Sequence, residues 1–333
     1  MAGYGYQYLL VNKPSNMAGQ RKVGIIGSGL IGRSWAMLFA GAGFNVVMYD
    51  VDSAQLDGAK VSIKQQLNEL ERQGLLRGTL LAEEQFSLIS TSENLSEAVK
   101  DAIHIQECVP ENVDLKKQMF SKLNDLCTLD ETVLCSSTSC ILPSKIFTGL
   151  RRVSQCIVAH PCNPPYHCPL TEIIPHPETS EDAVQRTREL MAKIGQEPVM
   201  VKREIDGFAL NRMQYAIINE AWRLVEDGIM TPEDVDKVFT TGLGMRYAFI
   251  GPFETIHLNA EGTENYMQRY ASSIRRVSSS FGPIPTFDGK TLEHVEQRMA
   301  SRIPSVPDEL NKRRQWRDDR LVALAKLKKQ MDS

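Results

Sequence analysis

The sequence has no excess of basic residues. Its 333 residues include 38 Lys and Arg against 41 Asp and Glu, a formal charge of −3, and the pI is about 6.1. Proteins that bind nucleic acid or an anionic membrane surface usually carry clustered positive charge. The composition therefore predicts neither nucleic acid nor a membrane as a partner.

Long hydrophobic runs and targeting signals are also missing. A bilayer-spanning helix needs roughly 20 consecutive apolar residues, and no run in the chain approaches that length. The first twenty residues contain one Lys and no Arg. Secretory signals have a longer apolar stretch, and mitochondrial presequences contain arginines. We therefore expect residues 1–20 to be a flexible tail and the protein to be cytoplasmic.

The cysteine pattern does not predict a disulfide framework. Seven cysteines, an odd number, lie between Cys108 and Cys168 in the middle of a long chain. Disulfide scaffolds are typical of small secreted domains, so a reducing compartment is expected here. Four potential metal ligands do fall close together, at His160, Cys162, His167 and Cys168. The prolines among them and a spacing unlike common zinc patterns predict no metal site.

What the sequence does contain is an alternation of strand-like and helix-like segments. Residues 22–26 and 45–49 are short and rich in Val and Ile, as buried parallel strands are. Further strands are predicted at 87–90, 104–108, 133–136, 155–159 and 198–201, with helices such as 113–126 and 181–194 between them. This alternation predicts an α/β fold with a parallel sheet.

Beyond residue 201 the strand signal stops. Residues 207–225 and 310–331 have helical patterns, and the sequence TPED at 231–234 has a Thr N-cap followed by Pro at the first helical position. We therefore predict a tail at 1–20, an α/β domain at 21–203 and an all-helical domain at 204–333.

A glycine-rich turn joins the first strand to the first helix. The sequence GSGLIG is a GxGxxG pattern in the strand–turn–helix context that it needs. Gly27 permits the tight turn, Gly29 lets the backbone approach a pyrophosphate, and Gly32 lets the helix pack against the strand. Leu30 and Ile31 open the helix, whose N–H groups face the phosphates. The pattern predicts a Rossmann-type dinucleotide-binding domain.

The residue after the second strand is acidic. Asp50 follows the middle glycine by about twenty residues, where a carboxylate accepts the ribose hydroxyls of NAD. Asp52 adds negative charge and no arginine follows, so the 2′-phosphate of NADP would be repelled. The predicted cofactor is NAD.

Polar residues with no obvious packing role follow predicted strand ends and the domain boundary. Oxidation of an alcohol needs a base for the hydroxyl proton, and histidine suits this role when a carboxylate stabilises its imidazolium form. His160 and Glu172 meet if the proline-rich stretch between them folds back as a loop. Ser139 and Asn211 are candidates to hydrogen-bond the developing carbonyl oxygen. The alternative for His160 is an ordinary core histidine.

These motifs, in this order, resemble the 3-hydroxyacyl-CoA dehydrogenase superfamily from residue 22 onward. They are GSGLIG, Asp50, STS ending at Ser139, AHPCNP, LTEII, GFALNR and GPFE. Within the superfamily, SSTSC, VAHPCNPP, NEAWRLVEDG, GLGMRYAFIGPFE and RRQWRD are most similar to the lambda-crystallin branch, which has L-gulonate 3-dehydrogenase activity. The resemblance implies an NAD-binding domain, a helical substrate and dimerisation domain, and a homodimer.

The resemblance also implies roles for individual residues. It makes His160 the base, Glu172 its partner, and Ser139 and Asn211 substrate contacts. It further implies that two charged residues of PENVDLKK, Glu111 and Lys116, contact the nicotinamide side of NAD. Without the resemblance, both would be interpreted as solvated surface charges.

Two departures distinguish this chain from the acyl-CoA branch. The segment IKQQLNELERQGLLRG lacks the lysine cluster with which acyl-CoA enzymes hold the CoA phosphates, and MRYAFI precedes GPFE. A guanidinium binds a carboxylate through two hydrogen bonds, which makes Arg246 a candidate to bind a free acid. The alternative is a helix-terminal or dimer-contact arginine.

The predicted activity is NAD-dependent oxidation of the 3-hydroxyl of L-gulonate to 3-dehydro-L-gulonate. Three alternatives remain open at this point. Carnitine 3-dehydrogenases share the Arg-aromatic-Ala-Phe segment before GPFE, and 3-hydroxyacyl-CoA oxidation belongs to the wider superfamily. The third is a lens structural protein that has kept the enzyme fold.

Overall fold

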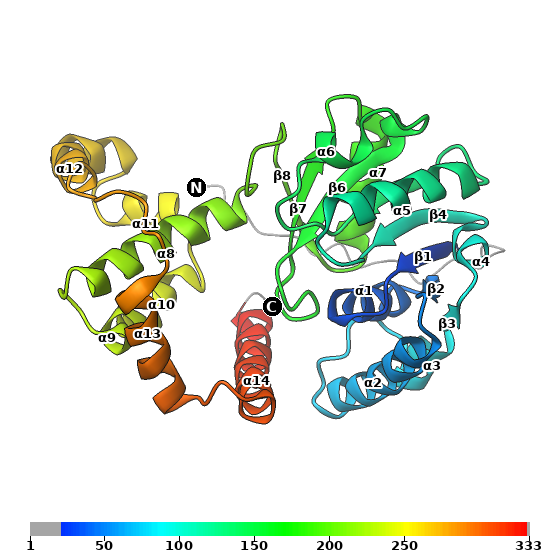
Figure 1. Cartoon of the computed structure of the whole chain (residues 1–333), viewed down its shortest axis with the longest axis horizontal. Helices are drawn as coiled ribbons and strands as arrows, with labels where there is room; N and C mark the ends of the chain where they lie inside the picture. The colour runs from blue at the N-terminus through cyan, green and yellow to red at the C-terminus, as the bar shows by residue number, and fades with distance from the viewer. Residues whose placement is uncertain (1–20, 332–333) are drawn as a thin grey trace. The chain divides into compact units, whose positions relative to one another are not determined.

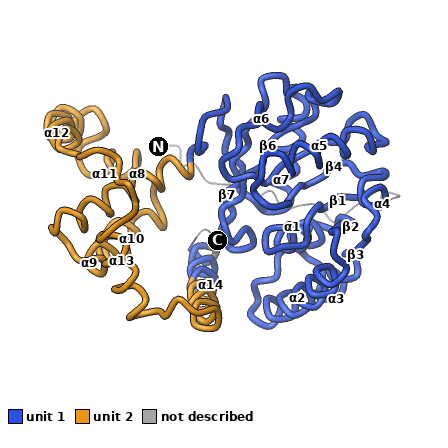
Figure 2. Tube along the Cα trace, in the orientation of Figure 1, with its two compact units in different colours: residues 1–209, 321–333 blue, residues 210–320 orange. Residues whose placement is uncertain are grey.

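The structure is a computed structural model that describes residues 21–331, so the tail predicted at 1–20 lies outside the described residues. The chain divides into two compact units (Figure 2). Of the described residues, unit 1 contains 21–209 and 321–331, and unit 2 is Leu210–Arg320. The boundary predicted from the sequence falls slightly earlier, between residues 203 and 204. The division into a cofactor domain and a substrate domain stays a prediction.

An eight-stranded sheet forms the centre of unit 1 (Figure 1). Its strands in spatial order are β3 (Ile89–Ser92), β2 (Asn45–Tyr49), β1 (Lys22–Ile26), β4 (Ala102–Glu107), β5 (Val133–Ser136), β6 (Cys156–Pro161), β7 (Leu170–Pro175) and β8 (Glu197–Met200). All neighbours are parallel except β6 and β7. The predicted Rossmann-type α/β fold is confirmed, but a purely parallel sheet is wrong.

Two local predictions also need correction. The sequence pattern predicts no strand at 170–175, yet after the proline-rich loop the chain forms β7 antiparallel to β6. The strand expected at 87–90 begins at Ile89, because Ser87 ends a short helix, α3 (Ala82–Ser87).

Helices cover both faces of the sheet. One face packs against α1 (Leu30–Gly41), α2 (Ser53–Arg72) and α7 (Glu181–Lys193), and the other against α4 (Leu95–Val99), α5 (Val113–Leu126) and α6 (Pro143–Phe147). Along β5, Val133 and Cys135 enter the first core and Leu134 enters the second. This alternation follows from the two-residue period of a strand, and it explains why strands buried on both faces are apolar throughout.

Unit 2 contains helices and no strand among its residues. They are α8 (Leu210–Glu226), α9 (Pro232–Val238), α10 (Gly244–Tyr247), α11 (Pro252–Leu258), α12 (Thr263–Ser278), α13 (Gly289–Arg302) and most of α14 (Pro307–Met331). As predicted, Thr231 caps α9, with its Oγ1 accepting a hydrogen bond from the Asp234 amide at 3.2 Å. Within residues 21–331, no helix has the length and apolar character needed to cross a membrane.

A buried histidine in β4 gives unit 1 a pH-dependent stability. His104 is 1% exposed, and burial lowers its pKa from 6.5 to about 4. The unfolded chain therefore takes up the proton first as the pH falls. The stability present above pH 6.5 is lost toward pH 4, and about 2 kcal/mol of it is lost between pH 7 and pH 5.

We expect His104→Gln to reduce this pH dependence. Glutamine does not titrate and can still hydrogen-bond to Gln106, the neighbour of His104 at 2.9 Å. Urea unfolding at pH 7 and pH 5 should show that the variant loses about 2 kcal/mol less than the wild type. Equal losses in both proteins would mean that other groups cause the acid destabilisation.

Candidate active site

The turn between β1 and α1 has the shape that a dinucleotide pyrophosphate requires. Gly27 has a φ of +105°, and a Cβ there would lie 2.8 Å from the carbonyl oxygen of Cys108. At Gly32 a Cβ would lie 2.0 Å from the carbonyl oxygen of Gly27. Both positions therefore require glycine. At Gly29, in contrast, no described atom lies within 4 Å of the Cβ position, so a ligand can approach the backbone.

The first turn of α1 offers backbone N–H groups at the same place. The helix begins at Leu30, whose side chain is half exposed, and Ile31 packs partly against the core. Gly29 is the N-cap residue, so no N-cap side chain bonds to the first N–H groups of α1, and none of the first-turn residues is acidic. Uncapped N–H groups and the helix dipole favour an anion at this position.

Asp50 lies beside this turn and is held there by Ser28. The Ser28 amide and hydroxyl both donate to Asp50 Oδ2, at 2.8 and 2.7 Å, and the Asp52 amide lies 3.4 Å from Oδ1. Asp52 itself caps α2 by accepting from the Ala54 amide at 2.9 Å. The turn, the helix start and the Asp50 carboxylate together fit the pyrophosphate and ribose of NAD.

His160 and Glu172 are direct neighbours across the antiparallel strands β6 and β7. Nδ1 of His160 lies 2.8 Å from Oε2 of Glu172, and the two residues are 5% and 1% exposed. The other oxygen of Glu172, Oε1, accepts from the Ala209 amide at 2.7 Å. With Nδ1 donating to the fixed carboxylate, Nε2 is the nitrogen left to accept a proton.

A strained turn at residues 207–208 precedes the backbone amide that bonds to Glu172. Gly207 and Phe208 both have positive φ values, 74° and 50°, and for a phenylalanine this conformation is rare. The turn places the Ala209 amide on Glu172 and the Phe208 ring 5.7 Å from the His160 ring. Backbone strain of this kind gathers at functional sites, where the surrounding contacts hold it.

Glu111 forms hydrogen bonds with the segment that carries Ser139, residues 136–140. Its Oε1 accepts from the Thr138 hydroxyl at 2.5 Å and from the Ser139 and Cys140 amides at 2.9 and 3.2 Å. Burial acts to raise the pKa of Glu111, but the Thr138 hydrogen bond, the charge of Lys116 and the two amides outweigh it and lower the pKa. The structure thus brings two predicted site residues, Glu111 and Ser139, into direct contact.

Lys116 is buried, so its interpretation as a solvated surface charge is wrong. It is 1% exposed, and its Nζ lies 2.8 Å from Glu107 Oε1 and 3.5 Å from Glu111 Oε2. Sequence reasoning missed Glu107, which ends β4 and is fully buried. A carboxylate at the end of a predicted buried strand was the signal available to find it.

The two remaining predicted residues lie in unit 2. Asn211 is buried in the first turn of α8. Arg246 is exposed on the short helix α10, and none of the acidic residues in the described chain forms an ion pair with it. Their roles toward a substrate remain proposals.

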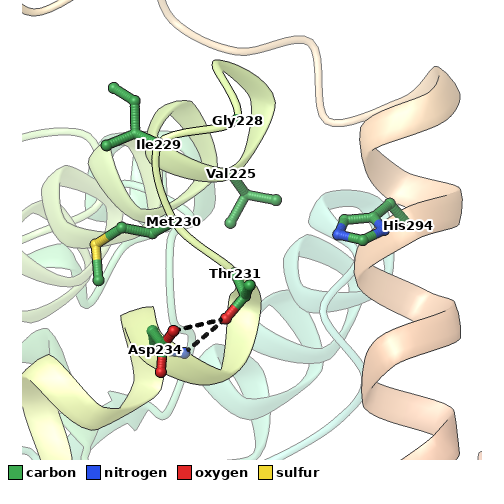
Figure 3. A pocket seen from close by; sticks show the side chains of 7 residues that line it. All are labelled: Val225, Gly228, Ile229, Met230, Thr231, Asp234 and His294. Atoms are coloured by element: carbon green, nitrogen blue, oxygen red, sulfur yellow. Dashed lines mark hydrogen bonds between the residues drawn. The ribbon is translucent and has the colours of Figure 1, made fainter.

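A surface cavity of about 580 Å³ in unit 2 lies elsewhere (Figure 3). It is lined by Val225, Gly228, Ile229, Met230, Thr231, Asp234 and His294. Thr231 and Asp234 bond to each other in the cap of α9, and the other lining side chains are mostly apolar. It includes none of the predicted catalytic or cofactor residues, so it is not the predicted site.

Two family models match consecutive parts of the chain. Residues 22–205 match the NAD-binding domain of 3-hydroxyacyl-CoA dehydrogenase, and residues 207–294 match the C-terminal domain of the same family. The first match covers the sheet, the glycine turn and the His160–Glu172 pair. The second covers most of unit 2.

Individual relatives agree with the models. Lambda-crystallin of Oryctolagus cuniculus is 59% identical over 307 residues, 92% of this chain and 96% of that protein. L-carnitine dehydrogenase of Oceanobacillus iheyensis is 33% identical over 88% of each chain. Among solved structures, an NAD⁺-dependent 5-formyl-3-hydroxy-2-methylpyridine 4-carboxylic acid 5-dehydrogenase has a TM-score of 0.78 at 26% identity, covering 92% of this chain and 98% of that one. The predicted resemblance and the NAD cofactor are confirmed, and the chain belongs to the 3-hydroxyacyl-CoA dehydrogenase family.

Proposed function

We propose that this NAD-dependent hydroxy-acid dehydrogenase oxidises the 3-hydroxyl of L-gulonate to 3-dehydro-L-gulonate. The observation that carries the chemistry is the buried His160–Glu172 pair, with its 2.8 Å contact. Support for the substrate comes from the motifs shared with the lambda-crystallin branch and from the identity with rabbit lambda-crystallin over nearly the whole chain.

The proposed mechanism separates the proton from the hydride. Nε2 of His160 takes the hydroxyl proton while the C–H bond breaks, and Glu172 stabilises the imidazolium that forms. When bound, NAD supplies the acceptor for the hydride. Ser139 and Asn211 hydrogen-bond the substrate oxygen as it becomes a carbonyl. Arg246 binds the substrate carboxylate through its guanidinium.

Steady-state rates with L-gulonate, L-carnitine and 3-hydroxybutyryl-CoA test the choice of substrate. L-carnitine is included because dehydrogenases of that name are relatives. We expect the highest kcat/KM with L-gulonate. A preference for L-carnitine or the CoA thioester would contradict the proposal, and no turnover with any of them would favour a purely structural lens role.

Asp50 should determine the preference for NAD over NADP. Asp50→Ser removes the carboxylate that accepts the ribose hydroxyls, and losing a hydrogen bond to a charged group costs about 1.5–3 kcal/mol. We expect the KM for NAD to rise about 10-fold or more. The ratio of kcat/KM with NAD to kcat/KM with NADP should fall. Asp52→Asn, which removes a nearby charge but keeps a cap for α2, should have a smaller effect. If the wild type had the same kcat/KM with NADP as with NAD, Asp50 would not determine a cofactor preference.

We also propose that unit 2 forms a homodimer. Large apolar side chains on helices α8 and α12 are exposed: Met213, Tyr215, Ile217 and Ile218 on α8, and Met267, Tyr270, Ile274 and Val277 on α12. A second copy would bury these faces, because soluble proteins seldom leave so many apolar side chains in water. Sedimentation at micromolar concentration should give about twice the chain mass of 37.3 kDa. A stable monomer would argue against the dimer.

A further inference from the structure

Two buried charged residues, Glu107 and Lys116, lie next to the segment that carries Ser139. The Lys116 ammonium group lies 2.8 Å from Glu107 Oε1, 3.1 Å from the carbonyl oxygen of Val109 and 3.5 Å from Glu111 Oε2. Glu107 and Lys116 are buried, and replacing a buried ion pair by apolar side chains of similar size is often neutral or stabilising. Stability alone therefore gives no reason for charges here, and a role in the site does.

Glu107 also contacts the first residue of the segment, Ser136. Its Oε2 accepts from the Ser136 hydroxyl at 2.6 Å, and the Ser136 oxygen in turn accepts from the Thr138 amide at 3.2 Å. Glu111 contacts the segment at its other end, through Thr138, Ser139 and Cys140. Both ends are thus held by carboxylates, and Lys116 bridges the two.

The contacts of Glu107 are those of an ionised carboxylate. Ser136, Lys116 and the Val109 amide all donate to it, the last at 2.6 Å. Burial raises the pKa of Glu107, while the charge and hydrogen bond of Lys116 and the other donors act against the rise. An ionised carboxylate only accepts hydrogen bonds, so three donors fit this state.

We propose that Glu107 is a positioning residue: through Lys116 and Ser136 it fixes the segment from which Ser139 contacts the substrate. The proposal rests on the substrate role of Ser139 proposed above. Displacing a substrate-orienting group by about 1 Å can cost up to roughly 100-fold in rate. Loss of Glu107 should therefore act on turnover, although Glu107 itself touches no substrate.

The test compares Glu107→Gln with a matched control, Thr132→Val. Thr132 is also fully buried and donates to the Ala102 carbonyl at 2.7 Å, but it precedes β5, whereas Ser136 ends that strand. We expect Glu107→Gln to lower kcat about 10-fold or more. Amide hydrogen exchange at Ser139 and Cys140 should become faster. Thr132→Val should lose stability without either effect.

Glu107→Asp keeps the charge and shortens the side chain, so it should fold and recover part of kcat. If Glu107→Gln does not fold, Glu107→Asp is compared with the control instead. The proposal is overturned if the folded Glu107 variant matches Thr132→Val in kcat and in exchange at residues 139–140.

Ser139→Ala separates this proposal from the function on which it rests. Full turnover in Ser139→Ala would refute the substrate role of Ser139 and, with it, this proposal. Impaired turnover in Ser139→Ala, combined with Glu107 variants that behave like the control, would refute the positioning role alone.

Discussion

Replacing His160 by glutamine is expected to reduce turnover by roughly 100-fold or more, the usual scale for the loss of a general base. Glutamine is close in size and can still bond to Glu172, which remains fixed by the Ala209 amide. The glycine turn and Asp50 are untouched, so NAD affinity should stay the same. Pre-steady-state NADH formation and NAD titration measure the two effects separately.

Two further variants make this result specific. Glu172→Gln should lose less activity than His160→Gln, because it weakens stabilisation of the imidazolium but leaves the base in place. His176→Gln changes another buried histidine, just after β7, whose Nε2 bonds to Thr148 at 3.0 Å. It should keep full turnover. A fully active His160→Gln enzyme would rule out the proposed mechanism.

Replacing Arg246 by methionine is expected to raise the KM for L-gulonate by at least about 30-fold, equivalent to about 2 kcal/mol. Loss of a charge-assisted pair costs about 2–5 kcal/mol, partly because the substrate carboxylate is left unpaired. NAD affinity should hardly change. Arg246→Lys should recover only part of the loss, because an ammonium group lacks the planar fork of a guanidinium.

The control for this experiment is Arg276→Met, which removes another exposed arginine from unit 2, on α12. Its KM for L-gulonate should match that of the wild type. If Arg246→Met weakens NAD and L-gulonate binding alike, or if it unfolds the protein, Arg246 is structural. Another group would then have to bind the carboxylate.

The start of unit 1 was predictable because its signals are local. The bounds of β1 and β2 agree with the sequence pattern, and the glycine turn and Asp50 lie in the connections that follow them. Each of these features depends on residues a few positions apart. Strand length, turn geometry and helix start are therefore all present in one continuous stretch of sequence.

The rest of the candidate site depends on contacts between distant residues. The contact between His160 and Glu172 depends on the pairing of β7 with β6. The sequence of β7, LTEIIP, is short and contains polar residues, so its pattern did not predict a strand. The burial of Lys116 was equally hidden, because a charged residue on a helix is usually solvated. The ion pair with Glu107 on β4 explains why the Lys116 side chain is buried.

The pairing of β6 with β7 also predicts where changes in chain length are not tolerated. Side chains of successive strand residues point to opposite faces, so slipping β7 by one residue would replace Glu172 by Thr171 or Ile173 opposite His160. The loop that joins the two strands is constrained as well, because Tyr166 is buried in the core and its hydroxyl accepts from the Arg77 amide at 3.0 Å. A single-residue deletion in β7 would therefore remove the partner of the base, and the loop could not absorb the shift without moving a buried side chain.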